Sequence, residues 1–244
     1  KGFSVLLVCN SPISEKDRQS LSSCVWRFVE RKNFGYDFGG YRDGIHSLWL
    51  GSVVPESLII LNDSVWFPLT CSESMLDAME RSSAQFVGAL RHVDSPGVDD
   101  EHAGIFLSYF FLIKRSVLLS RVYIDYWKDY ISTSNKYLTV RRGERGFSRA
   151  LFAAKVPSEG MYSRDRFLHL MESQSSDVLA LTLQYGAYTD IDFERARNEL
   201  LAHNSKDEQW RERALNHIRS VTAKRNFHSS FCYASIGLLG IPLL

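Results

Sequence analysis

The chain has 244 residues, of which 45% are hydrophobic and 13% aromatic, and its formal net charge is +1. This composition is ample for a buried core and excludes an intrinsically disordered protein. The balanced charge excludes a broadly basic surface for gripping nucleic acid, so we expect no nucleic-acid partner. No apolar run reaches the roughly 18–20 residues that a membrane-spanning helix needs.

The cysteines are far apart in the sequence and form no CxxC pair. They are Cys9, Cys24, Cys71 and Cys232. This spacing argues against a zinc site and against a dense disulfide framework. Neither end of the chain resembles a signal peptide. We therefore expect reduced thiols in a cytoplasmic protein.

Short apolar strands and helices alternate through the first 90 residues. The patterns predict strands at residues 3–9, 24–29, 57–61 and 86–90, and helices at residues 15–22 and 41–50. Residues 33–40 are dense in glycine and predict a loop that can approach a ligand closely. Strand, helix and strand at such short intervals indicate an α/β fold with a mostly parallel sheet flanked by helices.

The second half of the chain becomes increasingly helical. We predict one more strand at residues 105–113 and helices at residues 115–131, 144–154, 177–184 and 193–224. The change in character after residue 172 predicts an α/β domain over residues 1–172. Residues 173–244 are then a mainly helical extension whose last segment packs back on that domain.

Asn62, Asp63 and Ser64 directly follow the apolar strand at residues 57–61. Ligands of open parallel sheets bind just beyond the carboxyl ends of the strands. A carboxylate there can hold a divalent cation that neutralises a diphosphate leaving group. The simpler alternative is an Asx turn that ends the strand.

The glycine-dense stretch contains Asn33, Gly35 and Asp37. An ionised carboxylate in such a loop can accept several hydrogen bonds from sugar hydroxyls. The stretch is not a GxGxxG fingerprint, and a tight turn in which glycine serves only geometry explains it equally well.

Two further residues are candidates for chemistry. Glu144 follows a glycine and opens a predicted helix, where it is either a general base or a helix cap. His228 lies between the helical segment and the apolar tail, and taken alone it is most simply a packed or surface histidine. The sequence has no HExxH, GxSxG or GxxxxGK[ST] motif, which argues against zinc hydrolases, serine hydrolases and P-loop proteins.

Taken in order, these segments resemble the rhamnan synthesis protein F family of glycosyltransferases. The resemblance is carried by RKNFGYDFGG at residues 31–40 and LIILNDSVWFP at residues 58–68. Weaker matches are LSYF at residues 107–110, GERGFS at residues 143–148, and NFH with GIP at residues 226–228 and 240–242.

The resemblance implies a GT-A-like (Rossmann-like) fold and transfer of rhamnose or another deoxyhexose from a nucleotide-sugar donor. The acceptor it implies is a growing surface polysaccharide or lipid-linked glycan. By the same resemblance, Asp63 and His228 hold a divalent metal (Mn or Mg), and Asn33, Gly35, Asp37, Asn62, Asp63 and Ser64 bind the donor. Glu144 is the implied catalytic base, and the strand at residues 3–9 corresponds to the second strand of the family's sheet.

We therefore expect a metal-dependent, inverting glycosyltransferase, cytoplasmic or peripheral to the inner face of the membrane. One alternative is a non-catalytic glycosyltransferase-like domain that binds glycan or scaffolds a polysaccharide assembly complex. Another is a small-molecule-binding α/β domain. The apolar tail and the aromatic helix also leave open a contact with a membrane or a partner domain, although internal packing explains them more simply.

Overall fold

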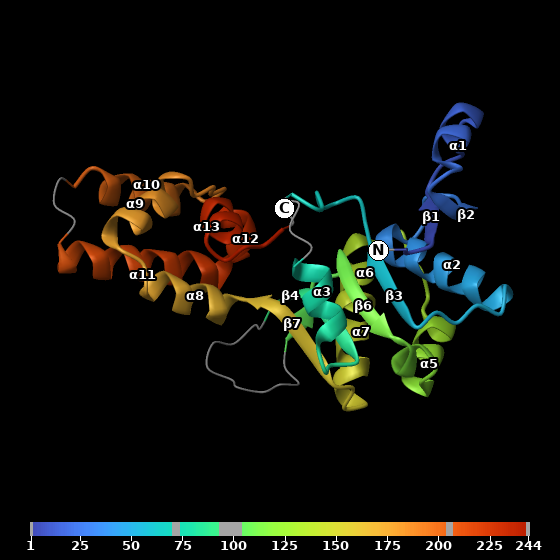
Figure 1. Cartoon of the computed structure of the whole chain (residues 1–244). Helices are drawn as coiled ribbons and strands as arrows, with labels where there is room; N and C mark the ends of the chain where they lie inside the picture. The colour runs from blue at the N-terminus through green and yellow to red at the C-terminus, as the bar shows by residue number, and fades with distance from the viewer. Residues whose placement is uncertain (1, 70–73, 93–103, 204–206, 243–244) are drawn as a thin grey trace. The chain divides into compact units, whose positions relative to one another are not determined.

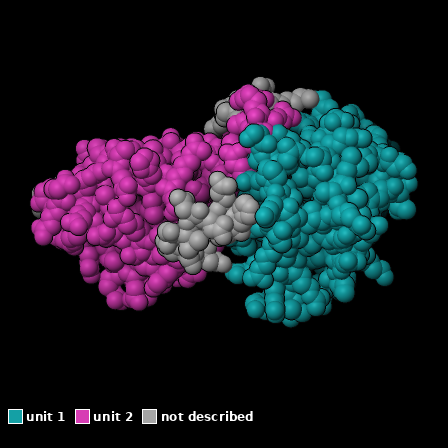
Figure 2. All heavy atoms as spheres, turned by 90° about the horizontal axis from the view of Figure 1, so that it is seen from below, with its two compact units in different colours: residues 1–62, 83–88, 101–158 teal, residues 63–82, 89–100, 159–244 magenta. Residues whose placement is uncertain are grey.

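The structure is a computed structural model that describes residues 2–69, 74–92, 104–203 and 207–242. The chain forms two compact units, coloured separately in Figure 2. The first comprises residues 1–62, 83–88 and 101–158, and the second comprises residues 63–82, 89–100 and 159–244. Cys9, Cys24 and Cys232 are free thiols, and Cys71 lies outside the described residues. Within the described residues, no helix is both long enough and apolar enough to span a bilayer.

The first unit carries most of the strands (Figure 1). Its elements are β1 (Val5–Cys9), α1 (Glu15–Leu21), β2 (Val25–Glu30), α2 (Tyr36–Leu50), β3 (Ser57–Leu61), the start of β4 (Phe86–His92), β5 (Ile105–Phe106), β6 (Phe110–Lys114), α4 (Arg115–Leu118), α5 (Arg121–Asp129), α6 (Lys136–Arg142) and α7 (Glu144–Ala153). The predicted strands at residues 3–9, 24–29, 57–61 and 86–90 are confirmed.

The strands form two sheets that differ in the relative direction of their strands, so the fold is mixed α/β. β1 pairs with β2 in parallel. In the larger sheet, with order β3-β6-β4-β5 and β7 beside β4, β6 is antiparallel to both β3 and β4. The prediction of a mostly parallel sheet is wrong there. β4 and β6 are apolar runs buried on both faces, and such runs do not reveal strand direction.

Two of the predicted elements are interrupted. The predicted strand at residues 105–113 is divided into β5 and β6 by a turn at residues 107–109, and the predicted helix at residues 115–131 is divided into α4 and α5. Ser120 accounts for the second break, because its side chain accepts a hydrogen bond from the Tyr123 N–H and caps the start of α5.

The glycine-dense stretch is helical over most of its length, which corrects the predicted loop. Gly35 has a φ of 86° and precedes α2, which therefore starts at Tyr36 rather than at residue 41. A Cβ added to Gly44 would lie 3.0 Å from Val8 Cγ2, and one added to Gly39 would lie 2.3 Å from the Phe34 carbonyl oxygen. Gly44 therefore lets α2 pack closely on β1, and Gly39 lets the helix pack closely on the residues that precede it.

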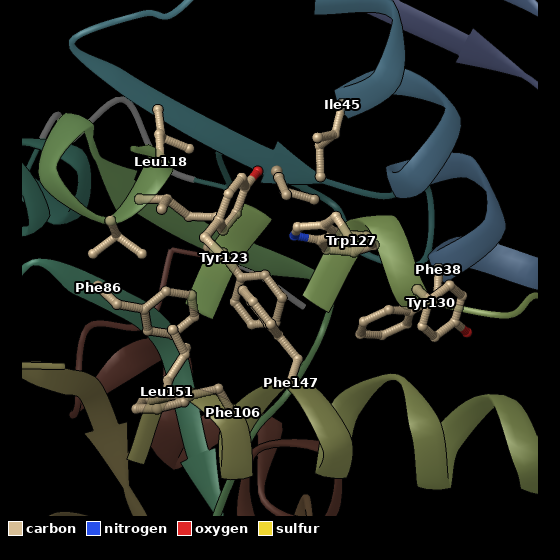
Figure 3. Close-up of a cluster of buried hydrophobic side chains, with 14 of the residues drawn as sticks. Phe38, Ile45, Phe86, Phe106, Leu118, Tyr123, Trp127, Tyr130, Phe147 and Leu151 are labelled. Atoms are coloured by element: carbon tan, nitrogen blue, oxygen red, sulfur yellow. The ribbon is translucent and has the colours of Figure 1, made fainter. Parts of the chain in front are cut away.

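An aromatic cluster forms the core of the first unit (Figure 3). Phe147 of α7 is fully buried at its centre. The ring centroids of five other aromatic residues lie within 4.9–6.3 Å of its own: Phe86, Phe111, Tyr123, Tyr126 and Trp127. At one end of the cluster, Phe38 of α2 stacks on Trp127. The cluster thus joins α2, α5 and α7 to the sheet.

The second unit is mainly helical (Figure 1). Its elements are α3 (Ser74–Arg81), the end of β4, β7 (Ser158–Ser163), α8 (Arg164–Glu172), α9 (Ser176–Gln184), α10 (Ile191–Leu201), α11 (Glu208–Lys224), α12 (Phe227–Ser230) and α13 (Cys232–Gly237). Phe167 of α8 stacks between Phe227 and Phe231. The predicted helix at residues 193–224 is divided into α10 and α11. The boundary predicted after residue 172 falls between α8 and α9 and stays a prediction.

The last described residues pack within the second unit. The Leu69 N–H donates to the Pro242 carbonyl oxygen (2.9 Å), and the Tyr162 hydroxyl donates to the Gly240 carbonyl oxygen (3.2 Å). Ile241 is buried. The tail therefore lies against the segment after β3 and against β7, and internal packing accounts for its apolar character.

Replacement of Phe147 by alanine removes the central ring of the aromatic cluster. We expect Phe147→Ala to lower the free energy of unfolding by about 3–5 kcal/mol, the usual cost of a large cavity in a core. Denaturant unfolding followed by tryptophan fluorescence measures the loss, because Trp127 lies 5.5 Å from Phe147. Leu50, which is 89% exposed, provides the control, and equal losses for Phe147→Ala and Leu50→Ala would contradict the assignment of this core.

The second unit contains a buried histidine that makes stability depend on pH. Burial, with a smaller effect from the Arg197 charge, lowers the pKa of His217 to about 4. In the unfolded chain a histidine takes up its proton near pH 6.5, so stability falls as pH drops from about 6.5 to about 4. We expect His217→Gln to reduce this slope in denaturant titrations without abolishing it, because the pKa of His228 is lowered to about 4 as well, while wild type and variant show the same slope between about pH 7 and 8. An unchanged slope below pH 6.5 would refute this origin.

Candidate functional site

The candidate site begins at the N-terminus of α2. Asp37 lies in the first turn of this 15-residue helix, where the helix dipole favours a negative charge. Its Oδ2 accepts a hydrogen bond from the Asn62 side-chain amide at 3.0 Å. Asp37 is half-buried, and the neighbouring Phe38 inserts into the aromatic cluster.

Asn62 joins α2 to the end of the larger sheet. It directly follows β3, and its backbone N–H donates to the Tyr109 carbonyl oxygen at 3.3 Å. This contact continues the β3–β6 ladder by one residue, since Leu61 already faces Phe110. The Asn62 side chain is therefore held in place at the strand end and reaches Asp37 from there.

Glu144 lies at the start of α7 and binds the turn between β5 and β6. Its Oε1 accepts two hydrogen bonds from Ser108, one from the hydroxyl at 2.6 Å and one from the backbone N–H at 3.0 Å. One helical turn later, the buried Ser148 hydroxyl accepts a hydrogen bond from the Phe106 N–H at 3.0 Å. The first two turns of α7 thus hold β5 and the β5–β6 turn.

Two tyrosines complete the arrangement. The Tyr41 hydroxyl, from α2, donates to the Ser108 carbonyl oxygen at 2.7 Å. Burial, and secondarily the negative charge of Glu144, raises the pKa of Tyr109 well above its usual range, so its hydroxyl keeps its proton at neutral pH. Asp37, Tyr41, Asn62, Ser108, Tyr109 and Glu144 form what we call the polar network.

The polar network brings together three of the residues predicted from the sequence: Asp37, Asn62 and Glu144. Tyr41 and Ser108 were not predicted as site residues. The local signals for Ser108 were a polar residue interrupting the apolar run at residues 105–113 and the weak family match LSYF at residues 107–110. Tyr41 gave no signal, because its role depends on a contact 67 residues away in the sequence.

The other predicted donor-binding residues of the first unit lie outside the polar network. Asn33 is exposed. Gly35 is buried, and a Cβ added there would lie 2.7 Å from Ser132 Cβ, so glycine is required at this position for packing as well as for its positive φ. Their assignment to donor binding stays a prediction.

Asp63, Ser64 and His228 belong to the second unit, and the polar network does not include them. Asp63 and Ser64 are exposed. Burial lowers the pKa of His228 to about 4, which leaves a neutral imidazole at pH 7, the form that ligates metals. Across the described residues, however, no three or more His, Cys, Asp or Glu side chains gather in a way that could hold a metal ion. The assignment of Asp63 and His228 to a divalent metal stays a prediction.

The fold and the polar network together define a mixed α/β protein with two carboxylates near the end of a sheet strand. The sequence matches the family described as "Rhamnan synthesis protein F" over residues 5–156, and the chain belongs to that family. The resemblance carried by the sequence motifs is thereby confirmed. The matched range contains every residue of the polar network and ends before His228.

One relative is the "Uncharacterized protein y4gN" of Sinorhizobium fredii (strain NBRC 101917 / NGR234). It is 36% identical to this chain over 144 residues, which cover 59% of this chain and 37% of that protein. The match therefore spans well under two thirds of the relative's length. No solved structure matches this chain. Family membership points to a role in the synthesis of rhamnan or a related polysaccharide.

The Ser108–Glu144 contact can be measured directly. We expect Ser108→Ala to lower the free energy of unfolding by about 1–3 kcal/mol, because Glu144 loses its hydroxyl donor. A denaturant series with Ser108→Ala, Glu144→Gln and the double variant measures the coupling between the two side chains. Ser134→Ala, at an exposed position of the same unit, is the control. Strictly additive losses for Ser108→Ala and Glu144→Gln would refute the contact.

Proposed function

We propose that the protein is a glycosyltransferase of polysaccharide synthesis. It moves a sugar, rhamnose or another deoxyhexose, from a nucleoside diphosphate donor to a growing surface polysaccharide or lipid-linked glycan. The observation that carries the proposal is the polar network, which joins Asp37, Asn62 and Glu144 at the end of β3 within the range matched by the family.

Glu144 is the proposed base. Ser108 holds its Oε1 with two hydrogen bonds, while Oε2 has no hydrogen bond to any described residue. Oε2 is therefore the oxygen available to take the proton of an acceptor hydroxyl. As that proton moves to Glu144, the acceptor oxygen bonds to the anomeric carbon, and the bond from this carbon to the diphosphate breaks. The nucleoside diphosphate leaves with the bonding electrons, and the configuration at the anomeric carbon inverts.

Asp37 and Asn62 are proposed to position the donor sugar. A carboxylate accepts hydrogen bonds from sugar hydroxyls, and the amide of Asn62 offers both a donor and an acceptor. The contact between their side chains fixes both at 3.0 Å before any ligand arrives, which reduces the entropy cost of binding. We place the reaction in the cytoplasm or at the inner face of the membrane, where donor and acceptor meet.

A second candidate function is a non-catalytic domain that binds glycan or scaffolds an assembly complex. Two observations favour it. Each network carboxylate already accepts a hydrogen bond from its own chain, and the described residues offer no cluster of metal ligands. The same hydrogen-bonding groups would then bind sugar hydroxyls without turnover.

Loss of the proposed base distinguishes the two functions. We expect Glu144→Gln to lower the rate of nucleoside diphosphate release from a nucleotide-rhamnose donor by about 10²–10⁴-fold, the usual contribution of general base catalysis. Coupled detection of the released diphosphate measures the rate, and denaturant unfolding checks that the variant is folded. Glu56→Gln, at an exposed carboxylate of the same unit, should retain the wild-type rate.

Two outcomes would decide against catalysis at this site. Full activity of Glu144→Gln at every pH would place the base elsewhere. Binding of glycan by wild-type protein, without release of diphosphate from any nucleotide sugar tested, would establish the non-catalytic function instead.

A further inference from the structure

The first unit contains a pocket of about 380 Å³ that lies apart from the polar network. One wall is the segment from the end of β2 into α2, with Arg31, Phe34 and Arg42. The opposite wall is the end of α5 and the residues after it, including Lys128 and Tyr130. No residue of the polar network lines this pocket.

Two of the residues lining the pocket carry buried polar atoms without a hydrogen-bond partner among the described residues: Arg42 Nε and Tyr130 Oη. Tyr130 is only 5% exposed, and its ring packs against Phe38 at the edge of the aromatic cluster (Figure 3). A buried polar atom without a partner costs free energy, so such atoms usually call for a water molecule, an ion or a ligand.

The hydroxyl of Tyr130 keeps its proton at neutral pH. Burial raises the pKa of Tyr130 to about 12, although the nearby Arg142 charge acts in the opposite direction. Tyr123 Oη and Trp127 Nε1 of the same cluster also lack partners among the described residues, but neither residue lines this pocket. Tyr130 differs from them because it lines the pocket.

The charges around the pocket leave two cations for a ligand. Arg31 is committed to the protein: its Nε donates to Asp43 at 2.6 Å, and its other nitrogens donate to Asn10 and to the Phe34 carbonyl oxygen. Arg42 and Lys128 have no ion pair with a described residue. Two acidic residues line the pocket. Asp43 pairs with Arg31, and Asp129 is exposed.

The rim of the pocket is apolar. Phe34 is 50% exposed and Ile131 is 69% exposed, on opposite walls. Two cations and a phenolic hydroxyl beneath such a rim match a ligand that joins an oxyanion to a planar or apolar portion. Phosphate oxygens accept hydrogen bonds from guanidinium, ammonium and hydroxyl donors together.

We propose that this pocket binds the diphosphate group of an organic diphosphate, with Arg42, Lys128 and Tyr130 as donors to its oxygens. This goes beyond the proposed function, because it concerns binding at residues that take no part in the proposed transfer. Two sources share this chemistry. One is a nucleoside diphosphate, whose base stacks on Phe34, and the other is an isoprenyl diphosphate, whose chain packs on Phe34 and Ile131.

Calorimetry on the full chain with inorganic diphosphate tests the oxyanion site. We expect Lys128→Met and Arg42→Met each to weaken binding about tenfold, the effect of losing one charge-assisted hydrogen bond. The control is Arg121→Met, which removes an exposed cation from the same helix as Lys128 and should leave the affinity unchanged. Absence of binding to wild-type protein up to about 10 mM would overturn the proposal.

Tyr130→Phe separates a binding role from a structural one. The Tyr130 hydroxyl has no partner in the described residues, so its removal should leave the melting temperature unchanged or raise it. We expect the same variant to weaken diphosphate binding about threefold or more. Unchanged affinity in Tyr130→Phe would remove this residue from the site and overturn the assignment.

Calorimetry with thymidine diphosphate and with geranyl diphosphate identifies which organic diphosphate the pocket binds. Tighter binding of the first than of inorganic diphosphate assigns the pocket to a nucleotide, and tighter binding of the second assigns it to a lipid carrier. If neither binds more tightly than inorganic diphosphate, the role of the rim is refuted. Glu144→Gln should retain diphosphate binding, so a failure of the proposed glycosyl transfer and a failure of this pocket give different results.

Discussion

The burial of Phe147 in the aromatic cluster is the contact on which the candidate site depends. Glu144, Phe147 and Ser148 are three and four residues apart on α7 and therefore share one face of the helix. The apolar energy that holds Phe147 against Trp127 and the sheet also fixes where the carboxylate of Glu144 lies. Ser148 then aligns β5, and Glu144 aligns the turn that follows it. The position of a polar group is here set by an apolar one.

The same reasoning applies to α2. Phe38 stacks on Trp127 within the cluster, and Gly44 allows the other side of the helix to approach Val8 of β1. Asp37 precedes Phe38 directly, so the packing of the ring sets the direction in which the carboxylate leaves the helix. Asn62 meets it there because β3 ends at the same place. Asp37 and Asn62 thus meet because the residues next to them are held by packing.

Much of this arrangement could be predicted from local patterns. The boundaries of β3 and α7 follow from an apolar run and from a glycine preceding a helical pattern, and the family follows from motifs at residues 31–40 and 58–68. Strand direction could not be predicted, because β4 and β6 are apolar on both faces. The start of α2 was misjudged because glycine was interpreted as loop, whereas Gly39 and Gly44 serve close packing within a helix. Tyr41 and Ser108 meet only through the tertiary fold.

The polar network and the pocket differ in the hydrogen bonds that they leave unmade. Network carboxylates accept hydrogen bonds from Asn62 and Ser108, and Glu144 Oε2 has no hydrogen bond to a described residue, which leaves it as an acceptor for a hydroxyl group. The pocket leaves donors unmatched, at Arg42 and Tyr130. Acceptors suit the hydroxyl-rich part of a sugar, and donors suit phosphate oxygens. Both adjoin α2, and this division of hydrogen-bonding character is the chemical pattern that recognition of sugars and of diphosphates by one protein requires.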